Sequence, residues 1–191
     1  LLLEAPFVHG FDSPAGKNAI RRINQMHKAY DITNDDMLYV LATFVVVPKR
    51  WMDDYGWRQF TYTEVVAVVN YYRTLARHMN IKDVPETYEE FAELMDSYEE
   101  KHFAYDAGGA HVAEMTLDLL ASFYPKPFVP VVRWFSRTLM DEPLIEAFRF
   151  KAPSRPARAI GYRAMRARAA FVRALPPRRK PYSFHQSPRL R

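Results

Sequence analysis

The feature that most constrains the fold is a run of almost wholly apolar residues, MLYVLATFVVV, at positions 37–47. Asn34 or Asp35 ahead of the run is a typical helix N-cap, and Pro48 behind it is a typical helix stop. A helix of this composition is apolar on nearly every face, so we expect it to be buried on nearly every side. It is shorter than the roughly 18 to 20 apolar residues of a membrane-spanning helix. The run therefore predicts the central helix of a globular domain.

Capping signals and apolar residues at spacings of three and four predict further helices on both sides of this run. One helix is expected to begin at Ser13-Pro14 and to carry Ile20, Ile23 and His27 on one apolar stripe. Two later starts are capping boxes, Thr61 with Glu64 and Thr87 with Glu90. Short helices are expected near 130–140 and 142–149. Because no segment shows sustained strand alternation, the predicted fold class is all-α, a single multi-helix bundle domain.

Composition divides the chain into two parts. Residues 1–150 carry 15 Lys and Arg against 22 Asp and Glu, whereas residues 151–191 carry 12 Lys and Arg and no acid. We expect a helical body over 1–150, and over 151–191 a basic amphipathic helix and an extended tail of the same domain. The absence of cysteine excludes disulfides, iron–sulfur clusters and cysteine-ligated zinc. The chain opens LLLEAPF with no initiator Met, so we expect an N-terminally truncated piece.

Two histidines lie near glutamates at helical spacing. Glu99 and His102 form a Glu-x-x-His unit, and His111 with Glu114 forms the reverse order. A non-heme di-iron carboxylate site in a helical bundle uses two Glu-x-x-His units and two further glutamates. Only one unit here has that orientation, so a di-iron enzyme is an alternative and acid–base or hydrogen-bonded pairs are the simpler interpretation.

His27 differs from the other histidines because it lies on the apolar stripe of its helix, four residues after Ile23. A buried imidazole must either satisfy its two nitrogens with hydrogen bonds or bind a ligand. The first case is an ordinary core histidine. The second requires a large apolar partner, and heme is one, because it needs an axial donor, a hydrophobic slot and a few cations for its propionates.

Several segments resemble the mpaB and rubber-oxygenase family, which includes the latex-clearing proteins. They are AIRRINQMHKAYDITNDDMLYVLATF from Ala19, then RWMDDYGWR, MNIKDVPETYEEF and PPRRKPYSF, in the family order. The resemblance implies an all-α fold that binds heme b, with His27 as the proximal iron ligand. It also implies an oxidoreductase that uses dioxygen to cleave a carbon–carbon double bond in a lipophilic, isoprenoid-type substrate.

The resemblance also bears on other positions. Arg22, with Arg21, is a candidate for the heme propionates, and Thr43 is a candidate to face the pocket. Bacterial relatives have a second histidine where this chain has Leu41. The family's distal arginine and threonine lie upstream of the Met-His helix, so the catalytic residues of this chain are unknown.

The expected partners are a lipophilic small molecule, dioxygen and a membrane surface that meets the basic C-terminal region, with no nucleic acid. The expected location is membrane-associated, at the endoplasmic reticulum through a missing N-terminal anchor, or else cytoplasmic. A second alternative to the heme enzyme is a non-catalytic helical module that binds a membrane surface through its basic tail.

Overall fold

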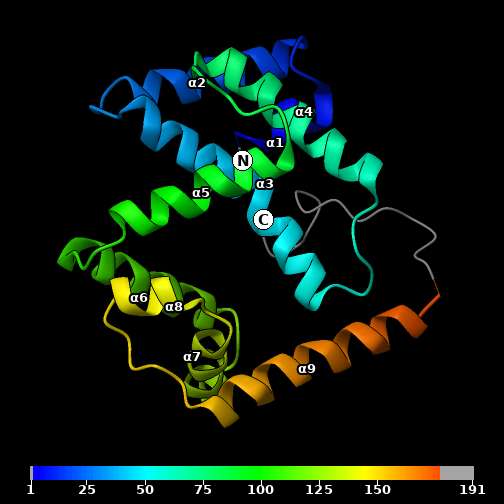
Figure 1. The fold of residues 1–191 in the computed structure, drawn as a ribbon, viewed down its shortest axis with the longest axis vertical. Helices are drawn as coiled ribbons and strands as arrows, with labels where there is room; N and C mark the ends of the chain where they lie inside the picture. The colour runs from blue at the N-terminus through cyan, green and yellow to red at the C-terminus, as the bar shows by residue number, and fades with distance from the viewer. Residues whose placement is uncertain (1, 177–191) are drawn as a thin grey trace.

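The computed structural model describes residues 2–176, and over these residues the chain forms α-helices and one short 3-10 helix without any β-strand (Figure 1). The all-α prediction is confirmed. The remainder of the predicted tail, residues 177–191, lies outside the described residues. The elements are α1 (Glu4–His9), α2 (Pro14–His27), α3 (Asn34–Tyr55), α4 (Tyr62–Met79), α5 (Tyr88–His102), α6 (Ala107–Ser122), η1 (Lys126–Phe128), α7 (Val129–Thr138), α8 (Glu142–Ala147) and α9 (Arg155–Ala174).

The local capping signals place most helix starts correctly. The Ser13 hydroxyl accepts a hydrogen bond from the Gly16 backbone at the start of α2, and both predicted capping boxes form at α4 and α5. The predicted cap of α3 is wrong by one residue, because Thr33 is the N-cap and Asp36 completes a capping box with it. Asn34 instead accepts a hydrogen bond from the Lys82 backbone at 2.9 Å. Its side chain therefore ties the start of α3 to the loop after α4.

The predicted end of the central helix at Pro48 is wrong, because α3 continues to Tyr55 with the proline inside it. Proline in a helix interior removes one backbone hydrogen bond and costs about 3 kcal/mol. Side chains beyond the proline offset this cost. Arg50 donates two hydrogen bonds of 2.7 Å to Asp96 on α5, and Lys49 forms an ion pair of 2.6 Å with Asp53. Tertiary contacts thus outweigh the local preference.

The prediction that this helix is buried on nearly every side is also wrong. Leu41, Val45 and Val46 are buried in the core, but Val40 is 50% exposed and Val47 is 47% exposed. The reason is that α4, α5 and α9 pack against only part of the surface of α3. One apolar face of the helix is left uncovered by other helices.

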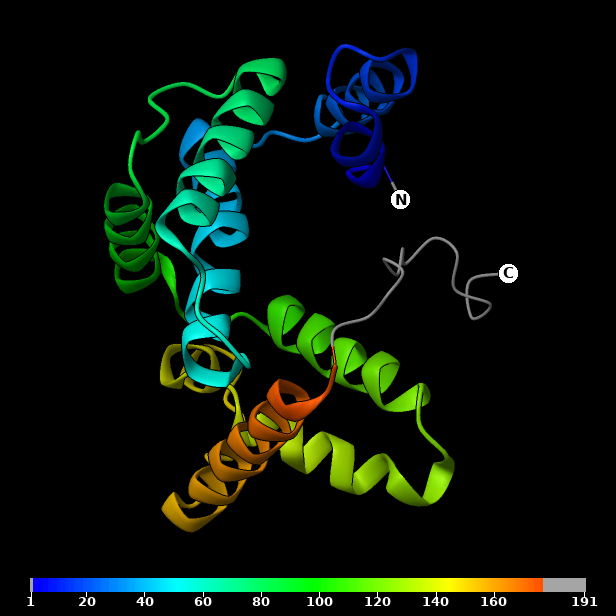
Figure 2. The ribbon, with the colours of Figure 1, turned by 90° about the vertical axis from the view of Figure 1, so that its right-hand side faces the viewer.

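The helices are arranged around α3, which runs through the middle of the molecule with α1 and α2 at one end (Figure 2). α6 and α7 form a pair away from that end, held by hydrogen bonds from Arg133 and Arg137 to Glu114. The basic helix predicted after residue 150 is α9, which packs against α7 and α3. Gly161 allows the close approach to α7, because a Cβ at that position would collide with the Thr138 side chain.

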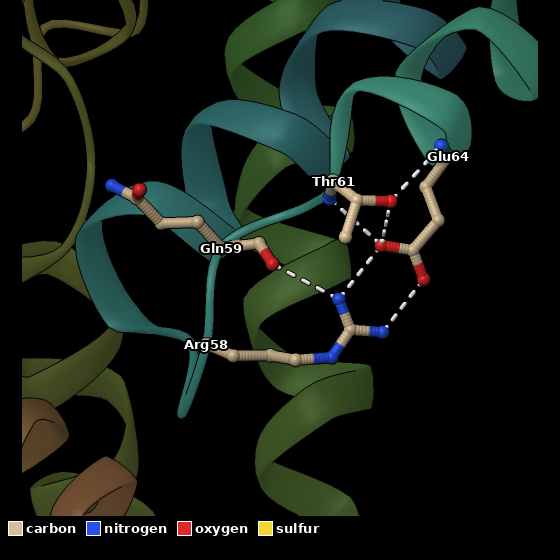
Figure 3. A network of polar contacts seen from close by, with 4 residues as sticks. All are labelled: Arg58, Gln59, Thr61 and Glu64. Atoms are coloured by element: carbon tan, nitrogen blue, oxygen red, sulfur yellow. Dashed lines mark hydrogen bonds and ion pairs between the residues drawn. The ribbon is translucent and has the colours of Figure 1, made fainter.

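The turn between α3 and α4 is stabilised by a compact polar network (Figure 3). Arg58 donates two hydrogen bonds of 2.7 Å to the Glu64 carboxylate and one of 2.9 Å to the Gln59 carbonyl. The same carboxylate accepts from the Thr61 backbone at 2.8 Å. Hydrogen bonds from Arg58 and Thr61 lower the pKa of Glu64 from 4.5 to about 2. The ionised carboxylate is therefore the form that fixes this turn.

We predict that the stabilisation by Glu64 depends on pH in the acid range. Because the folded-state pKa lies below the unfolded one, the contribution is complete above pH 4.5 and is lost as pH falls through about 2. Glu64→Gln keeps a capping-box side chain but removes the charge. Its thermal midpoint should lie below that of the wild type at pH 7, and the difference should shrink between pH 4.5 and 2. A difference that is constant with pH would show that the charge is irrelevant.

Candidate functional site

His27 is the last residue of α2, and its ring is half-buried. Ile20 and Ile23 of the same helix are buried beneath it, as the apolar stripe predicts. The Nδ1 atom of His27 is buried and has no hydrogen-bond partner among the described residues, 2–176. Leaving such an atom unsatisfied costs about 1 to 3 kcal/mol, and folded proteins seldom tolerate it. The structure thus shows a half-buried histidine whose Nδ1 atom is not satisfied by a hydrogen bond within residues 2–176.

A cavity of about 490 Å³ lies beside His27. Twelve of its fourteen lining residues are apolar, and the two polar ones are His27 and Asp36. The walls come from the end of α2, the uncovered face of α3, the end of α4 and the chain around Leu2 and Leu3. The volume lies within the roughly 300 to 1,000 Å³ typical of small-molecule sites. The cavity is thus an apolar slot with one imidazole on its wall.

Asp36, the second polar residue of the cavity, is hydrogen-bonded to two neighbouring side chains. Its carboxylate accepts hydrogen bonds from the Tyr98 hydroxyl and from the Thr33 hydroxyl, the latter at 2.7 Å. The bond from Tyr98 is the main cause of the lowered pKa of Asp36, and it raises the pKa of Tyr98 to about 12. Asp36 therefore stays ionised at neutral pH and serves to fix the start of α3.

An aromatic and polar cluster joins α3 to α5 next to Asp36. The Tyr39 ring stacks on Tyr98 and the Tyr98 ring stacks on His102, each with ring centroids 4.3 Å apart. The Tyr39 hydroxyl donates to Glu99 at 3.1 Å, and burial raises the pKa of that carboxyl group. Glu99 is therefore occupied by a contact between α3 and α5, and His102 is occupied by a ring stack within α5.

Glu114 and His111 are the other two residues of the di-iron alternative. Glu114 accepts hydrogen bonds from Arg133 and Arg137, and His111 is exposed on α6. Within residues 2–176, no three His, Asp or Glu side chains are grouped so that they could hold a metal ion. The fold does not bring Glu99, His102, His111 and Glu114 together into a carboxylate-bridged centre.

The remaining predicted site residues lie outside the cavity wall. Arg22 is exposed and donates to Gln25 at 3.4 Å, and Arg21 donates to Asn18 at 2.9 Å. The Thr43 hydroxyl donates to the Val40 carbonyl at 2.7 Å, within its own helix. Among the residues that the structure describes, no lysine or arginine lines this wall. The roles of Arg22 at a propionate and of Thr43 at the pocket remain predictions.

The residues around His27 fit the ring and the iron of a heme. A porphyrin requires an axial nitrogen donor and a large apolar slot. The unpartnered imidazole nitrogen and the twelve apolar lining residues provide these two features. A single axial ligand suffices for heme, so the site differs from one that must hold a bare metal ion.

The cavity and the all-α fold define a helical protein with a histidine-bearing apolar site, and comparison of the sequence with protein families identifies its class. Residues 7–174 match the model of the family described as ER-bound oxygenase mpaB/B'/Rubber oxygenase, catalytic domain. The chain belongs to this family.

Curated relatives agree with this assignment. The chain is 26% identical over 187 residues to ER-bound oxygenase mpaB' of Penicillium brevicompactum, covering 88% of this chain and 44% of the relative. It is 26% identical over 155 residues to ER-bound oxygenase mpaB of Penicillium roqueforti, covering 71% and 52%. The chain thus spans about half the length of the curated relatives it matches. No solved structure matches it significantly.

Proposed function

We propose that this chain is the His27-bearing part of a heme b-dependent oxygenase that cleaves a carbon–carbon double bond in a lipophilic, isoprenoid-type molecule. The observation that carries the proposal is the unpartnered Nδ1 of His27 on the wall of an otherwise apolar cavity. Membership of the oxygenase family supports the reaction class. Resemblance to the latex-clearing proteins supports the substrate class.

In this proposal His27 holds the heme iron through one imidazole nitrogen. Heme, when bound, supplies the chemistry of dioxygen activation. The Met26–His27 end of α2 orients the ligand, because Ile20 and Ile23 anchor that helix in the core. Asp36 is ionised and already bonded to Tyr98 and Thr33, so it is not a proton donor to the cavity.

The apolar walls have two tasks in this proposal. They bind an alkene, which has no polar group, through the hydrophobic effect. This effect contributes a free energy of about 25 cal/mol per Å² of buried apolar surface. They also exclude water from the reacting centre, which protects reactive species from side reactions. Leu41 and Leu75, which are both buried and both line the cavity, are the residues best placed to keep it dry.

The reaction is tested by isotope labelling. Cleavage of one double bond by one dioxygen molecule yields two carbonyl compounds, each with one oxygen atom from the dioxygen. The heme-loaded chain would be incubated with a prenyl alkene under ¹⁸O₂, and the products reduced with borohydride and weighed by mass spectrometry. We expect two cleavage products, each with one ¹⁸O, and their loss in His27→Ala. Cleavage that survives His27→Ala, or an absence of cleavage by a chain shown to carry heme, would contradict the proposal.

We further propose that the chain rests on a membrane surface through α9. Arg163, Arg168 and Arg173 are exposed on this helix beside Ile160 and Phe171, which are 56% and 66% exposed. Such a mixture of arginine and apolar side chains is typical of helices that lie at anionic interfaces. The curated relatives are named as ER-bound. Among the helices of residues 2–176, none is long and apolar enough to cross a bilayer.

The exposed arginines of α9 give a test of this membrane proposal. The triple variant Arg163→Gln, Arg168→Gln, Arg173→Gln should bind anionic vesicles more weakly, by up to about 1 kcal/mol per residue at low salt. Sedimentation with phosphatidylserine-containing vesicles measures the change. The matched control removes three charges from α2, as Lys17→Gln, Arg21→Gln, Arg22→Gln. An equal loss in both triple variants would show that only net charge matters and that α9 is not the binding surface.

A further inference from the structure

A second apolar cavity, of about 370 Å³, lies along the same pair of helices as the cavity of His27. The two cavities share one lining residue, Phe44. We call the cavity beside His27 the proximal cavity and this one the distal cavity. The distal cavity is lined mainly by aromatic and aliphatic side chains, among them Phe7, Phe60, Val68 and Tyr88.

One face of each helix lines both cavities in turn. On α3 the lining residues Met37, Leu41, Phe44 and Pro48 recur at spacings of four, three and four. On α4 they are Val65, Val68, Tyr72, Leu75 and Met79, again three or four apart. Such spacings place side chains on one helix face. Since α3 and α4 run antiparallel, with Met37 near Met79 and Pro48 near Val68, the two cavities lie end to end in one trough.

The boundary between the cavities is a pair of side chains. The rings of Phe44 and Tyr72 stack with their centroids 5.5 Å apart and their planes at 5°. Phe44 is 36% exposed, so neighbouring atoms do not fully enclose its ring. A side chain on a helix face changes rotamer without any movement of the backbone. The residue shared by the two cavities is therefore a side chain whose ring is stacked on one side and partly exposed.

The distal cavity favours a neutral ligand. Its one charged lining residue is Lys49, whose ammonium group forms an ion pair of 2.6 Å with Asp53 and lies 4.9 Å from the centre of the Tyr88 ring. A carboxylate or phosphate would have to compete with Asp53 for this ammonium group. The aromatic walls instead suit an uncharged hydrocarbon chain. From Met37 to Pro48 the trough follows α3 for about 16 Å at 1.5 Å per residue.

We propose that the distal cavity is a substrate subsite that holds the far part of an elongated, neutral lipophilic chain whose reacting part reaches the proximal cavity past Phe44. Phe44 is the residue that sets how much of the chain passes from the proximal to the distal cavity. The inference rests on the proposed function for the identity of the reacting end, but binding of the chain requires only the two cavities. Molecules short enough to fit in the proximal cavity do not use the subsite.

The test is a series of neutral prenyl alcohols with ten, fifteen and twenty carbons, titrated into the 191-residue chain by calorimetry. The wild type should bind more tightly as the chain lengthens. Val68→Trp fills the distal cavity and should weaken binding of the two longer alcohols at least about tenfold. The reason is that loss of the contact made by even one methylene group in a hydrophobic pocket reduces binding by about this factor. Binding of the ten-carbon alcohol should not change.

Two further variants make the result unambiguous. Val66→Trp is the matched control, because Val66 is exposed on the same helix and lines neither cavity. Ala67→Trp is a second blocking variant at an exposed position that lines the distal cavity, and it protects the test if Val68→Trp fails to fold. Equal weakening of all three alcohols in the blocking variants, or no weakening in either of them, would overturn the proposal. Heme binding measured on the same variants is a separate readout, so failure of the heme proposal would leave the chain-length pattern interpretable.

Discussion

Leu41→Asp is expected to prevent the chain from folding stably. Leu41 is 3% exposed and packs in the core of α3 and α4 with residues such as Val45 and Leu75. Among residues 2–176, no arginine or lysine lines the cavity beside it, so the new carboxylate would be buried without a permanently charged partner. Burying an unpaired charge costs several kcal/mol, which is comparable with the roughly 5 to 15 kcal/mol stability of a whole domain.

Circular dichroism and thermal unfolding of the purified variant measure this effect. The matched control is Val47→Asp on the same helix, because Val47 is 47% exposed and lines neither cavity. Its carboxylate stays in water, so its stability should lie within about 1 kcal/mol of the wild type. If Leu41→Asp melts at the same temperature as Val47→Asp, the packing of α3 described above is wrong.

The helix starts could be predicted from sequence because capping is a local interaction. Thr61 with Glu64 and Thr87 with Glu90 need only residues three apart, and both boxes form. The end of α3 could not be predicted in this way. Pro48 is a strong local stop signal, but the helix continues because Arg50 bonds to Asp96, forty-six residues away. A local pattern contains no information about such a partner.

The candidate site was predictable in part, for a similar reason. The position of His27 on an apolar stripe follows from its spacing to Ile20 and Ile23, and the structure places these residues as expected. Other lining residues of the cavity, such as Met79 and Ile81, come from the end of α4 and from the loop that follows it. Their role depends on the register of two antiparallel helices. The sequence contains no local signal for this register.

The uncovered face of α3 was missed because composition alone does not say how many neighbours a helix has. The sequence of residues 37–47 is apolar on every side, yet Val40 and Val47 are about half exposed. An apolar face that no helix covers is where a lipophilic ligand gains most from binding. Val40 lines the cavity beside His27, so this part of the uncovered face belongs to the candidate site, whereas Val47 lines neither cavity.

His27→Ala is expected to weaken heme binding more than any other single substitution outside the core. Loss of an outer-shell partner of a metal ligand costs about 10- to 100-fold in affinity, and loss of the ligand itself should exceed about 100-fold. The same change should not lower the stability of the heme-free chain, because it removes a buried nitrogen that has no hydrogen-bond partner. We expect a thermal midpoint equal to or above that of the wild type, with unchanged helical content.

His102→Ala is the control for this variant. His102 stacks on Tyr98 within α5 and does not line the cavity beside His27, so its loss should lower stability slightly and leave heme affinity unchanged. The two histidines should thus show opposite patterns in the two measurements. Loss of heme in His102→Ala with retention in His27→Ala would mean that the wrong histidine was assigned.

The most direct test of the central claim, that His27 is the axial ligand of a heme, is an absorption titration of heme b into His27→Gly with and without free imidazole. Glycine leaves space for imidazole to occupy the position of the missing ring. The wild type should bind one heme per chain with the spectrum of an imidazole-ligated iron. His27→Gly should lose that spectrum and regain it when imidazole is added. A wild-type spectrum in His27→Gly without imidazole would contradict the claim.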